Sequence, residues 1–420
     1  MFEGVLNLFS SLFEKPFKVG IISYYYPFRK ATTSGVGTHV YNLVTHLSKL
    51  GCEVHVFTFS DKNQKDLKIK VGVGKIVLHF INPEFPYNVS DPVIGKRVRY
   101  TIFEDKVLNE VSIENFRRRF DVIHTHGWLT SSAFILKYLY RLPWVHTVHA
   151  LERNRLPSMT TEEKKLFRLT SWIEETIVDS DKLIAVSESI SKELVKAFGK
   201  VSKKIEVIPN GVDLKLFTPS QTSPKSVLSV TRFSKEKGIE MIPRIAYNIL
   251  SKVKSSKFTI VAPKSEIPTL KPIQKEFVWL SEKYPKRFIW ISNPLMPQDI
   301  ALYYRAAGIY LQPSFYESFG LCILEGMASG SVIVATNVGG IPEVVDKSGI
   351  LVNPKSEELS KAVIKLLRSD TLRNKYREKS LERVKSFDWP IVAKRTLDLY
   401  KEVVQKKKEI DFKSSESDKK

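Results

Sequence analysis

The feature that most constrains the fold of this chain is an alternation of short apolar runs with longer amphipathic segments, which occurs twice along its 420 residues. The first unit has a buried strand at 18–24, a helix at 36–50 that closes at Gly51, and a second strand at 53–59. Strands joined by a helix in this way pair in parallel, so the segment predicts a βαβ unit. Further strands of the first half are predicted at 75–81, 121–125, 144–148, 182–186 and 205–208.

The pattern stops after residue 208 and resumes at 226. Residues 209–225 begin with Pro209-Asn210-Gly211 and end in a stretch rich in Pro, Ser and Thr, which is typical of an interdomain linker. The second half predicts strands at 226–231, 258–262, 288–291, 309–312, 332–335 and 350–352. The expected fold class is therefore α/β, with two doubly wound, Rossmann-like domains at 17–208 and 226–388 that face each other across a cleft.

The two ends of the chain differ from these domains. Closing helices are expected at 355–368, 371–386 and 389–405, whereas residues 406–420 are charged and poor in apolar side chains, which predicts a disordered tail. Residues 1–16 carry apolar side chains at helical spacing and are expected to form an amphipathic segment. No run of about 18 uncharged apolar residues exists, so a membrane span is not expected.

The balance of 66 basic and 45 acidic residues gives a net charge of +21, which favours acidic partners. Nucleic acid is not expected among them, because the chain has neither zinc-finger spacing nor an aromatic and basic RNA-binding motif. A solvated basic surface, with segment 1–16 packed on its own domain, is expected, and peripheral association of this segment with an anionic membrane is the alternative. The two cysteines lie in different halves without a disulfide framework, which indicates a cytoplasmic location, including the inner face of the cell membrane.

Residues 311–328, Leu-Gln-Pro-Ser-Phe-Tyr-Glu-Ser-Phe-Gly-Leu-Cys-Ile-Leu-Glu-Gly-Met-Ala, carry the clearest chemical signal. A buried strand ends there and a helix is expected to begin near Gly320, so Glu317 lies on the loop and Glu325 two turns into the helix. The backbone N–H groups of Phe319, Gly320 and Leu321 would form an anion site between the two acids. A nucleotide sugar, with hydroxyls at both ends and phosphate in the middle, matches this arrangement. The alternative is that Glu317 caps the helix and Glu325 pairs with a lysine.

The same segment, with Gly339-Gly340-Ile341-Pro342-Glu343 after it, resembles the Glu-x7-Glu signature of retaining GT-B glycosyltransferases of family four. That group includes glycogen-synthase-like and sucrose-phosphate-synthase-like members. The resemblance spans about residues 17–405. It implies that Glu317 contacts the donor sugar near the reacting carbon and that Glu325 binds the ribose hydroxyls.

A loop between strand and helix at 230–238 holds Arg232 and Lys237, which the resemblance assigns to the donor diphosphate. Preorganised cations at that point stabilise the charge that a departing diphosphate gains. Lys235 in the same loop is expected to be solvated. In the first domain, Gly35 lies in a glycine-bearing loop where the backbone can approach a phosphate closely. Relatives have two adjacent glycines followed by an acidic residue there, so this loop departs from the family pattern.

Two predicted strands end in histidines, at His124-Thr125-His126 and at His146-Thr147-Val148-His149. No acidic or cysteine ligand lies at a helpful spacing, so no metal is expected. Similarity to glycogen-synthase-like members implies that His149 hydrogen-bonds the donor sugar. His126 and Arg153 are candidates for the cleft and its acceptor side.

Together these patterns predict a retaining glycosyltransferase that moves a hexosyl group, glucose first, from a nucleoside diphosphate sugar to a glycan, polysaccharide or lipid-linked acceptor. No cofactor and no metal are expected, because Arg232, Lys237 and a helix N-terminus suffice for the diphosphate. A nucleotide-sugar epimerase of GT-B fold and a nucleic-acid-binding protein are the alternatives.

Overall fold

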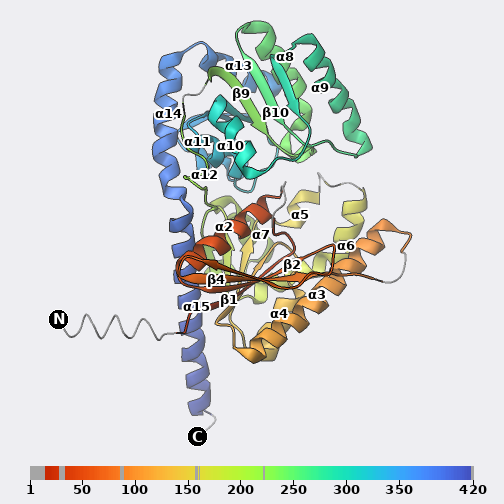
Figure 1. Ribbon diagram of the computed structural model, residues 1–420, viewed down its shortest axis with the longest axis vertical. Coiled ribbons are helices and arrows are strands. Elements are labelled where there is room, and N and C mark those ends of the chain that lie inside the picture. The colour runs from red at the N-terminus through yellow and green to blue at the C-terminus, as the bar shows by residue number, and fades with distance from the viewer. Residues whose placement is uncertain are drawn as a thin grey trace, which may run out of the picture.

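The computed structural model describes residues 15–27, 34–85, 89–156, 159, 161–220 and 223–417. The chain forms two α/β domains stacked along the long axis of the molecule, the first lower and the second upper in Figure 1. Each domain is built on its own sheet, of eight strands in the first and six in the second. The predicted pair of doubly wound domains is thereby confirmed. The amphipathic segment predicted at 1–16 lies almost wholly outside the described residues.

The first sheet has the strand order β3-β4-β2-β1-β5-β6-β7-β8. All neighbours pair in parallel except β3 and β4 at the edge, which are antiparallel. Strand β3 was not predicted, because lysines alternate with its apolar residues and leave it half exposed. The strands are β1 (Lys18–Ser23), β2 (Glu53–Phe59), β3 (Leu67–Val71), β4 (Gly74–Ile81), β5 (Val122–His126), β6 (Trp144–Val148), β7 (Lys182–Ala185) and β8 (Ile205–Val207).

Helices cover both faces of the first sheet. Because side chains alternate along a strand, Val54 and Val56 pack toward helix α2, whereas Phe57 packs toward α3. The helices are α2 (Gly35–Lys49), α3 (Pro92–Arg117), α4 (Ser131–Tyr140), α5 (Glu152–Arg155), α6 (Thr161–Glu175) and α7 (Glu188–Phe198), with short 3₁₀ turns η2 (Thr176–Asp179) and η3 (Ser202–Lys204).

The second sheet has the order β11-β10-β9-β12-β13-β14, and every pair is parallel. Its order reverses between β9 and β12, and ligands bind at such a point in open α/β sheets. The strands are β9 (Ser223–Val230), β10 (Lys257–Val261), β11 (Phe288–Ile291), β12 (Ala307–Gln312), β13 (Val332–Thr336) and β14 (Gly349–Val352). Strand β9 begins inside the linker predicted at 209–225.

Helices α8, α9 and α13 cover one face of the second sheet, and α10, α11 and α12 cover the other. Their bounds are α8 (Ile242–Lys252), α9 (Lys271–Lys283), α10 (Pro297–Ala306), α11 (Leu321–Ala328), α12 (Ile341–Val345), α13 (Ser356–Leu367) and α14 (Asp370–Val384). Short 3₁₀ turns are η4 (Lys235–Lys237), η5 (Ile239–Met241), η6 (Pro268–Leu270) and η7 (Lys385–Phe387).

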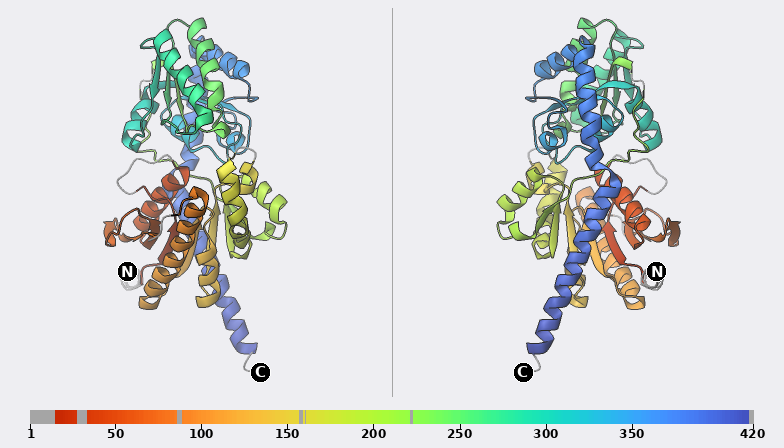
Figure 2. Two further views of the ribbon diagram at one scale, coloured as in Figure 1. Left: turned by 90° about the vertical axis from the view of Figure 1, so that its right-hand side faces the viewer. Right: turned by 90° about the vertical axis from the view of Figure 1, so that its left-hand side faces the viewer.

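Helix α15 (Trp389–Ser417) returns from the second domain to the first, packs on α2 and continues past the domain (Figures 1 and 2). Its first half buries Trp389, Tyr400 and Val403 in the first domain's core. The prediction of disorder from residue 406 was wrong for 406–417, which are helical. Ion pairs one turn apart support this extension, Lys406 with Glu402 at 2.6 Å and Lys407 with Asp411 at 3.4 Å.

The chain crosses between the domains twice, and the two crossings lie together. Val212, on the first crossing, forms an isolated parallel bridge with Asp388, and its N–H donates to the Phe387 carbonyl at 2.8 Å. Gly211 is required there, because a Cβ would lie 2.6 Å from the Trp389 ring. The start of the predicted linker is therefore a packed crossing.

Candidate active site

A cleft of about 1090 Å³ lies between the two domains and is lined by residues of both. Its wall includes Gly35 and His149 from the first domain and Arg232, Glu317 and Glu325 from the second. Gly35 follows β1, and Glu317 follows β12, so the carboxyl ends of the central strands of both sheets face this space. The volume is sufficient for a nucleotide sugar.

Two loops of the second domain are locked together beneath the cleft. The Glu236 carbonyl accepts hydrogen bonds from the N–H groups of Phe315 at 2.8 Å and Tyr316 at 3.1 Å. Gly238 adopts a left-handed conformation with φ of 66°, and a Cβ there would lie 1.8 Å from the Pro313 oxygen. Only glycine permits this approach, so it fixes the cationic loop against the acidic one.

Glu317 is 9% exposed and lies between these two loops. Its Oε2 accepts from Lys237 Nζ at 2.9 Å and from Ser314 Oγ at 3.4 Å. Its carbonyl accepts from the Gly340 N–H at 2.9 Å, and a Cβ on Gly339 would lie 1.9 Å from the same oxygen. Both the backbone and the carboxylate of Glu317 are thus held in place, as a group that acts on a reacting centre must be.

The two cations of the site are held differently. Lys237 is mostly buried and pairs with Glu317, whereas the Arg232 side chain is 49% exposed and donates to the buried Glu236 carboxylate at 2.7 Å. Arg232 therefore presents an open guanidinium edge to the cleft. Lys235, between them, is exposed to solvent and does not line the cleft.

Two helix N-termini meet across the cleft. Helix α11 begins at Leu321 after Gly320, whose φ of 108° turns the chain into the helix. Helix α2 begins at Gly35, and a Cβ on Gly35 would contact Leu321 Cδ1 at 3.5 Å. The first turns of both helices leave N–H groups without intrahelical partners, and both dipoles present their positive ends here. An anionic group between the domains would meet both.

Glu325 lies about one turn inside α11 on the cleft wall. Burial raises the pKa of this carboxyl to about 7, and the neighbouring Tyr304 hydroxyl limits the rise in pKa. That hydroxyl nevertheless makes no hydrogen bond within ordinary geometric limits. Near neutral pH, Glu325 is therefore close to the balance between its acid and its carboxylate form, and a partner with hydroxyl donors would favour the carboxylate.

Comparison with known proteins agrees with this geometry. The family model described as Glycosyltransferase Family 4 matches residues 33–216, and that described as Glycosyl transferases group 1 matches residues 215–383. The chain belongs to the family-four glycosyltransferases of GT-B fold. This enzyme class uses nucleotide-sugar donors, and the predicted family, fold and enzyme class are confirmed.

Three relatives of this glycosyltransferase show how much of the chain the similarity covers. The D-inositol 3-phosphate glycosyltransferase of Corynebacterium jeikeium is 27% identical over 398 residues, covering 88% of this chain and 92% of that protein. Sucrose-phosphate synthase from Thermosynechococcus elongatus superposes with a TM-score of 0.74 at 22% identity, covering 92% and 98% of the two chains. HepE of Anabaena, in complex with UDP and glucose, gives a TM-score of 0.68 at 16% identity, covering 92% and 100%.

Histidines of the glycosyltransferase gather behind the first-domain wall. His149 lines the cleft, whereas His126 lies behind it, with its Nδ1 at 3.2 Å from His149 Nε2. His126 is buried and does not reach the wall, in contrast to the expectation from the sequence. Burial, with the nearby His39, His146 and His124, holds the pKa of His149 well below its usual range. His149 is consequently a neutral hydrogen-bonding group at neutral pH.

Arg153 is also not on the cleft wall of the glycosyltransferase. Its Nε donates to the buried Glu174 carboxylate at 2.7 Å, and its guanidinium lies over the Phe198 ring at 4.5 Å. Glu152 and Glu174 line the cleft in its place. The sequence identified this charged segment but could not show that Arg153 pairs with Glu174 and does not face the cleft.

The sequence analysis missed residues that lie close to the site without lining the cleft. His39, one turn into α2, donates through Nδ1 to Asn210 Oδ1 at 2.7 Å and joins His126 and His149. Across the cleft, the Glu343 carboxylate accepts from the N–H groups of Glu188 at 2.6 Å and Ser189 at 2.7 Å, and so caps the first-domain helix α7. His39 stands in the same glycine-bearing loop and helix start as Gly35, which is the signal that could have found it.

Proposed function

We propose that this glycosyltransferase moves a hexosyl group, with glucose as the first expectation, from a nucleoside diphosphate sugar to an acceptor hydroxyl with retention at the anomeric carbon. The observation that carries the proposal is the arrangement along one cleft wall of Glu317, the cations Arg232 and Lys237, the N-terminus of α11, and Glu325. Together these groups match the sugar, the diphosphate and the ribose of one donor molecule. The UDP and glucose in the HepE structure support such a donor.

The diphosphate leaves when the bond between the anomeric carbon and its phosphate oxygen breaks. Arg232, Lys237 and the two helix N-termini would stabilise the negative charge that develops on that oxygen, and more strongly than they stabilise the bound donor. The new bond forms from the acceptor oxygen on the same face of the sugar, and the acceptor proton passes to the leaving phosphate oxygen. Because these groups supply the positive charge, we propose that transfer needs no divalent ion.

Glu317 and His149 would act on the sugar. The ion pair with Lys237 holds the Glu317 carboxylate toward the cleft, where it can accept hydrogen bonds from sugar hydroxyls and stabilise positive charge at the anomeric carbon. His149, neutral and half-buried, would hydrogen-bond another hydroxyl. Glu325 would accept from the ribose hydroxyls.

The first-domain wall supports an acceptor that carries sugar rings. Tyr25, Tyr100 and Trp128 line the cleft, and the last two pack edge to face with ring centroids at 4.8 Å. Flat apolar rings with polar edges suit the faces and hydroxyls of a glycan. A glycan, polysaccharide or lipid-linked glycan is therefore the proposed acceptor class.

Peripheral contact with an anionic membrane is proposed from the net charge and from exposed apolar side chains. The net charge is +21, and the end of α15 exposes Ile410 at 62% and Phe412 at 64% among lysines. No helix within the described part of the chain is both long and apolar enough to cross a bilayer.

The test is a panel of nucleotide sugars, scored by thermal stabilisation and by slow hydrolysis. Stabilisation by one donor, followed by a glycosylated product whose anomeric configuration matches the donor by NMR, is the expected result. Conversion of the donor to an isomer would instead support an epimerase. Absence of donor binding together with salt-steep binding to duplex DNA would support a nucleic-acid-binding protein.

A further inference from the structure

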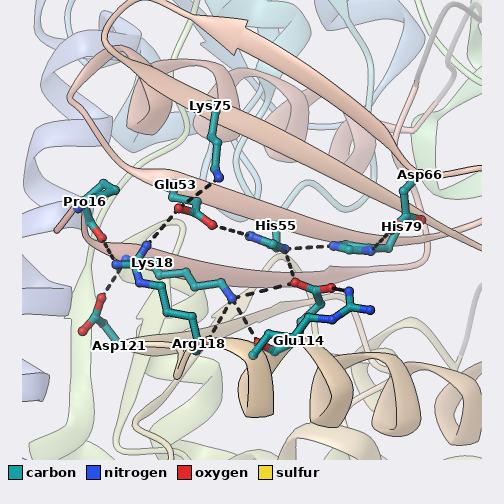
Figure 3. A network of polar contacts seen from close by, with 11 residues as sticks. Pro16, Lys18, Glu53, His55, Asp66, Lys75, His79, Glu114, Arg118 and Asp121 are labelled. Carbon is teal, nitrogen blue, oxygen red and sulfur yellow. Dashed lines mark hydrogen bonds and ion pairs between the residues drawn. The ribbon is translucent and has the colours of Figure 1, made fainter.

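A second polar cluster lies between helix α3 and the face of the first domain's sheet opposite α2 (Figure 3). Glu53 and His55 come from β2 and His79 from β4, and alternation of side chains places all three on the face that α3 covers. Glu114, near the end of α3, approaches them from the helix. None of these residues lines the donor cleft.

The two histidines form a chain between two carboxylates. His55 Nε2 lies 2.9 Å from Glu53 Oε1, and His79 Nδ1 lies 2.6 Å from Asp66 Oδ2. Glu53 Oε1 accepts the hydrogen of His55 Nε2, whereas His79 Nδ1 makes no hydrogen bond within ordinary geometric limits in spite of its short distance to Asp66.

The inner nitrogens of the two rings also lie close together, and His55 Nδ1, which carries no hydrogen in the neutral ring, presents a lone pair. His55 Nδ1 and His79 Nε2 are 2.9 Å apart, and Glu114 Oε2 lies 3.8 Å from His55 Nδ1 (Figure 3). Without a metal, His79 Nε2 can donate its hydrogen to His55 Nδ1. With that hydrogen on Nδ1 instead, beside the Asp66 carboxylate, both inner nitrogens and the Glu114 oxygen are available to bind a cation.

The cations around the cluster have partners of their own and do not lie between the two rings. Arg117 pairs with the other Glu114 oxygen, while Arg118 at 2.8 Å and Lys75 at 3.3 Å pair with Glu53 Oε2. Lys18 Nζ lies 4.0 Å from Glu114 Oε2 but is held by two backbone carbonyls, of Glu114 at 3.2 Å and Arg118 at 2.9 Å. Glu53 and Glu114 are thus neutralised by cations that do not lie between the rings.

We propose that His55, His79 and Glu114 form a binding site for a divalent transition metal of the Zn²⁺ type. The three ligand atoms lie within 4.8 Å of one another. Zinc binds imidazole nitrogen at about 2.0–2.1 Å in tetrahedral geometry, which requires ligand atoms about 3.3 Å apart, so a small opening of the ring pair admits the ion. Each histidine would keep its carboxylate partner, Glu53 or Asp66, in the arrangement that orients metal-bound imidazoles.

Such a metal would tie β2, β4, α3 and the Asp66 loop together without touching the donor. Because binding occurs only in the folded domain, it should stabilise that domain in proportion to the metal concentration. The site depends on neither the donor nor the reaction proposed above.

The experiment uses the full chain without an affinity tag, stripped with a chelator and titrated with Zn²⁺ by calorimetry, with melting recorded in parallel. We expect one ion per chain at this site and a higher melting temperature. His79→Gln should abolish that binding, and Asp66→Asn, a change at a half-exposed position, should weaken it by about 10–100-fold. His46→Gln, which removes a histidine of α2 elsewhere in the domain, is the matched control and should bind as the parent does.

Cobalt gives a second readout. Co²⁺ in a tetrahedral site of nitrogen and oxygen ligands absorbs visible light, and His79→Gln should remove that band. The proposal is overturned if the parent binds no ion, if His55→Gln and His79→Gln bind as the parent does, or if binding is lost only in His126→Gln. The last result would assign the ion to the cluster of His39, His126 and His149. Absence of binding would leave the two rings joined by an ordinary hydrogen bond.

Discussion

Glu325 offers the sharpest test, because its environment couples donor binding to pH. Burial raises the pKa of this carboxyl from 4.5 to about 7 in the ligand-free enzyme. If Glu325 accepts hydrogen bonds from ribose hydroxyls, binding requires the carboxylate. Below the pKa the donor must first displace a proton, so affinity falls tenfold for each pH unit.

The size of the effect follows from that pKa. With a value of about 7, affinity for a nucleotide sugar should rise about 25-fold between about pH 5.5 and about pH 7.5, then level off. Calorimetry with the intact nucleotide sugar measures this directly, because both its phosphates are esterified and do not titrate in that range. Glu325→Gln should bind more weakly and show no such rise. Tyr304→Phe should move the midpoint upward, since the hydroxyl lowers the pKa of Glu325.

Stability gives a second measurement that needs no donor. A carboxyl with a raised folded pKa binds more protons in the folded state, so its unfavourable contribution is absent below 4.5 and grows as pH rises to about 7. This rise in the pKa of Glu325 corresponds to about 3 kcal/mol. Glu325→Gln should therefore gain about 3 kcal/mol over the parent between about pH 4 and about pH 8. The matched control is Glu378→Gln at an exposed position of α14, where no gain is expected.

A pH-independent donor affinity in the parent would refute the reasoning, as would an unchanged pH profile in Glu325→Gln. If the stability difference appeared without the binding difference, Glu325 would be buried as described but would not contact the ribose. The two measurements thus separate the burial of this carboxyl from its role in donor binding.

Three further predictions concern the same enzyme. Glu317→Ala should lower turnover by on the order of a hundredfold or more with donor affinity nearly intact, because its carboxylate acts on the transition state; near-normal kinetics with a verified donor would show that this role is wrong. Arg232→Ala should cost roughly 2–4 kcal/mol in transition-state stabilisation, measured from kcat/KM, whereas the exposed Lys235→Ala should be near neutral; equal small losses would indicate diffuse attraction. In flotation with anionic liposomes, the full chain should bind at low salt and detach at high salt, more strongly than a form starting at Lys15; equal partition of both would exclude the first segment, and no binding by either would exclude the membrane.

Local sequence patterns were sufficient to predict most of the helices and strands. The strands of both sheets follow apolar runs that were visible in the sequence, and helix α11 begins directly after Gly320, as the turn residues before it indicated. Strand β3 was not predicted, because an edge strand keeps its lysines exposed and lacks a continuous apolar run. The end of α15 escaped because its composition resembles disorder, whereas ion pairs one turn apart and continuity with a packed helix keep it helical.

The sequence by itself determined the two-domain α/β fold and the Glu317 and Glu325 motif, because periodicity and turn residues act over a few neighbours and need no distant partner. Only the tertiary structure decided which side chains meet. His39 on α2 meets His149, which follows strand β6, and Glu343 caps a helix of the other domain. Arg153 pairs with the Glu174 carboxylate and does not face the cleft, and no sequence pattern indicated this pairing. These contacts depend on the order of strands in the sheet and on how the domains dock, and partners that lie from 21 to 155 positions apart in the chain leave no local pattern that records such an encounter.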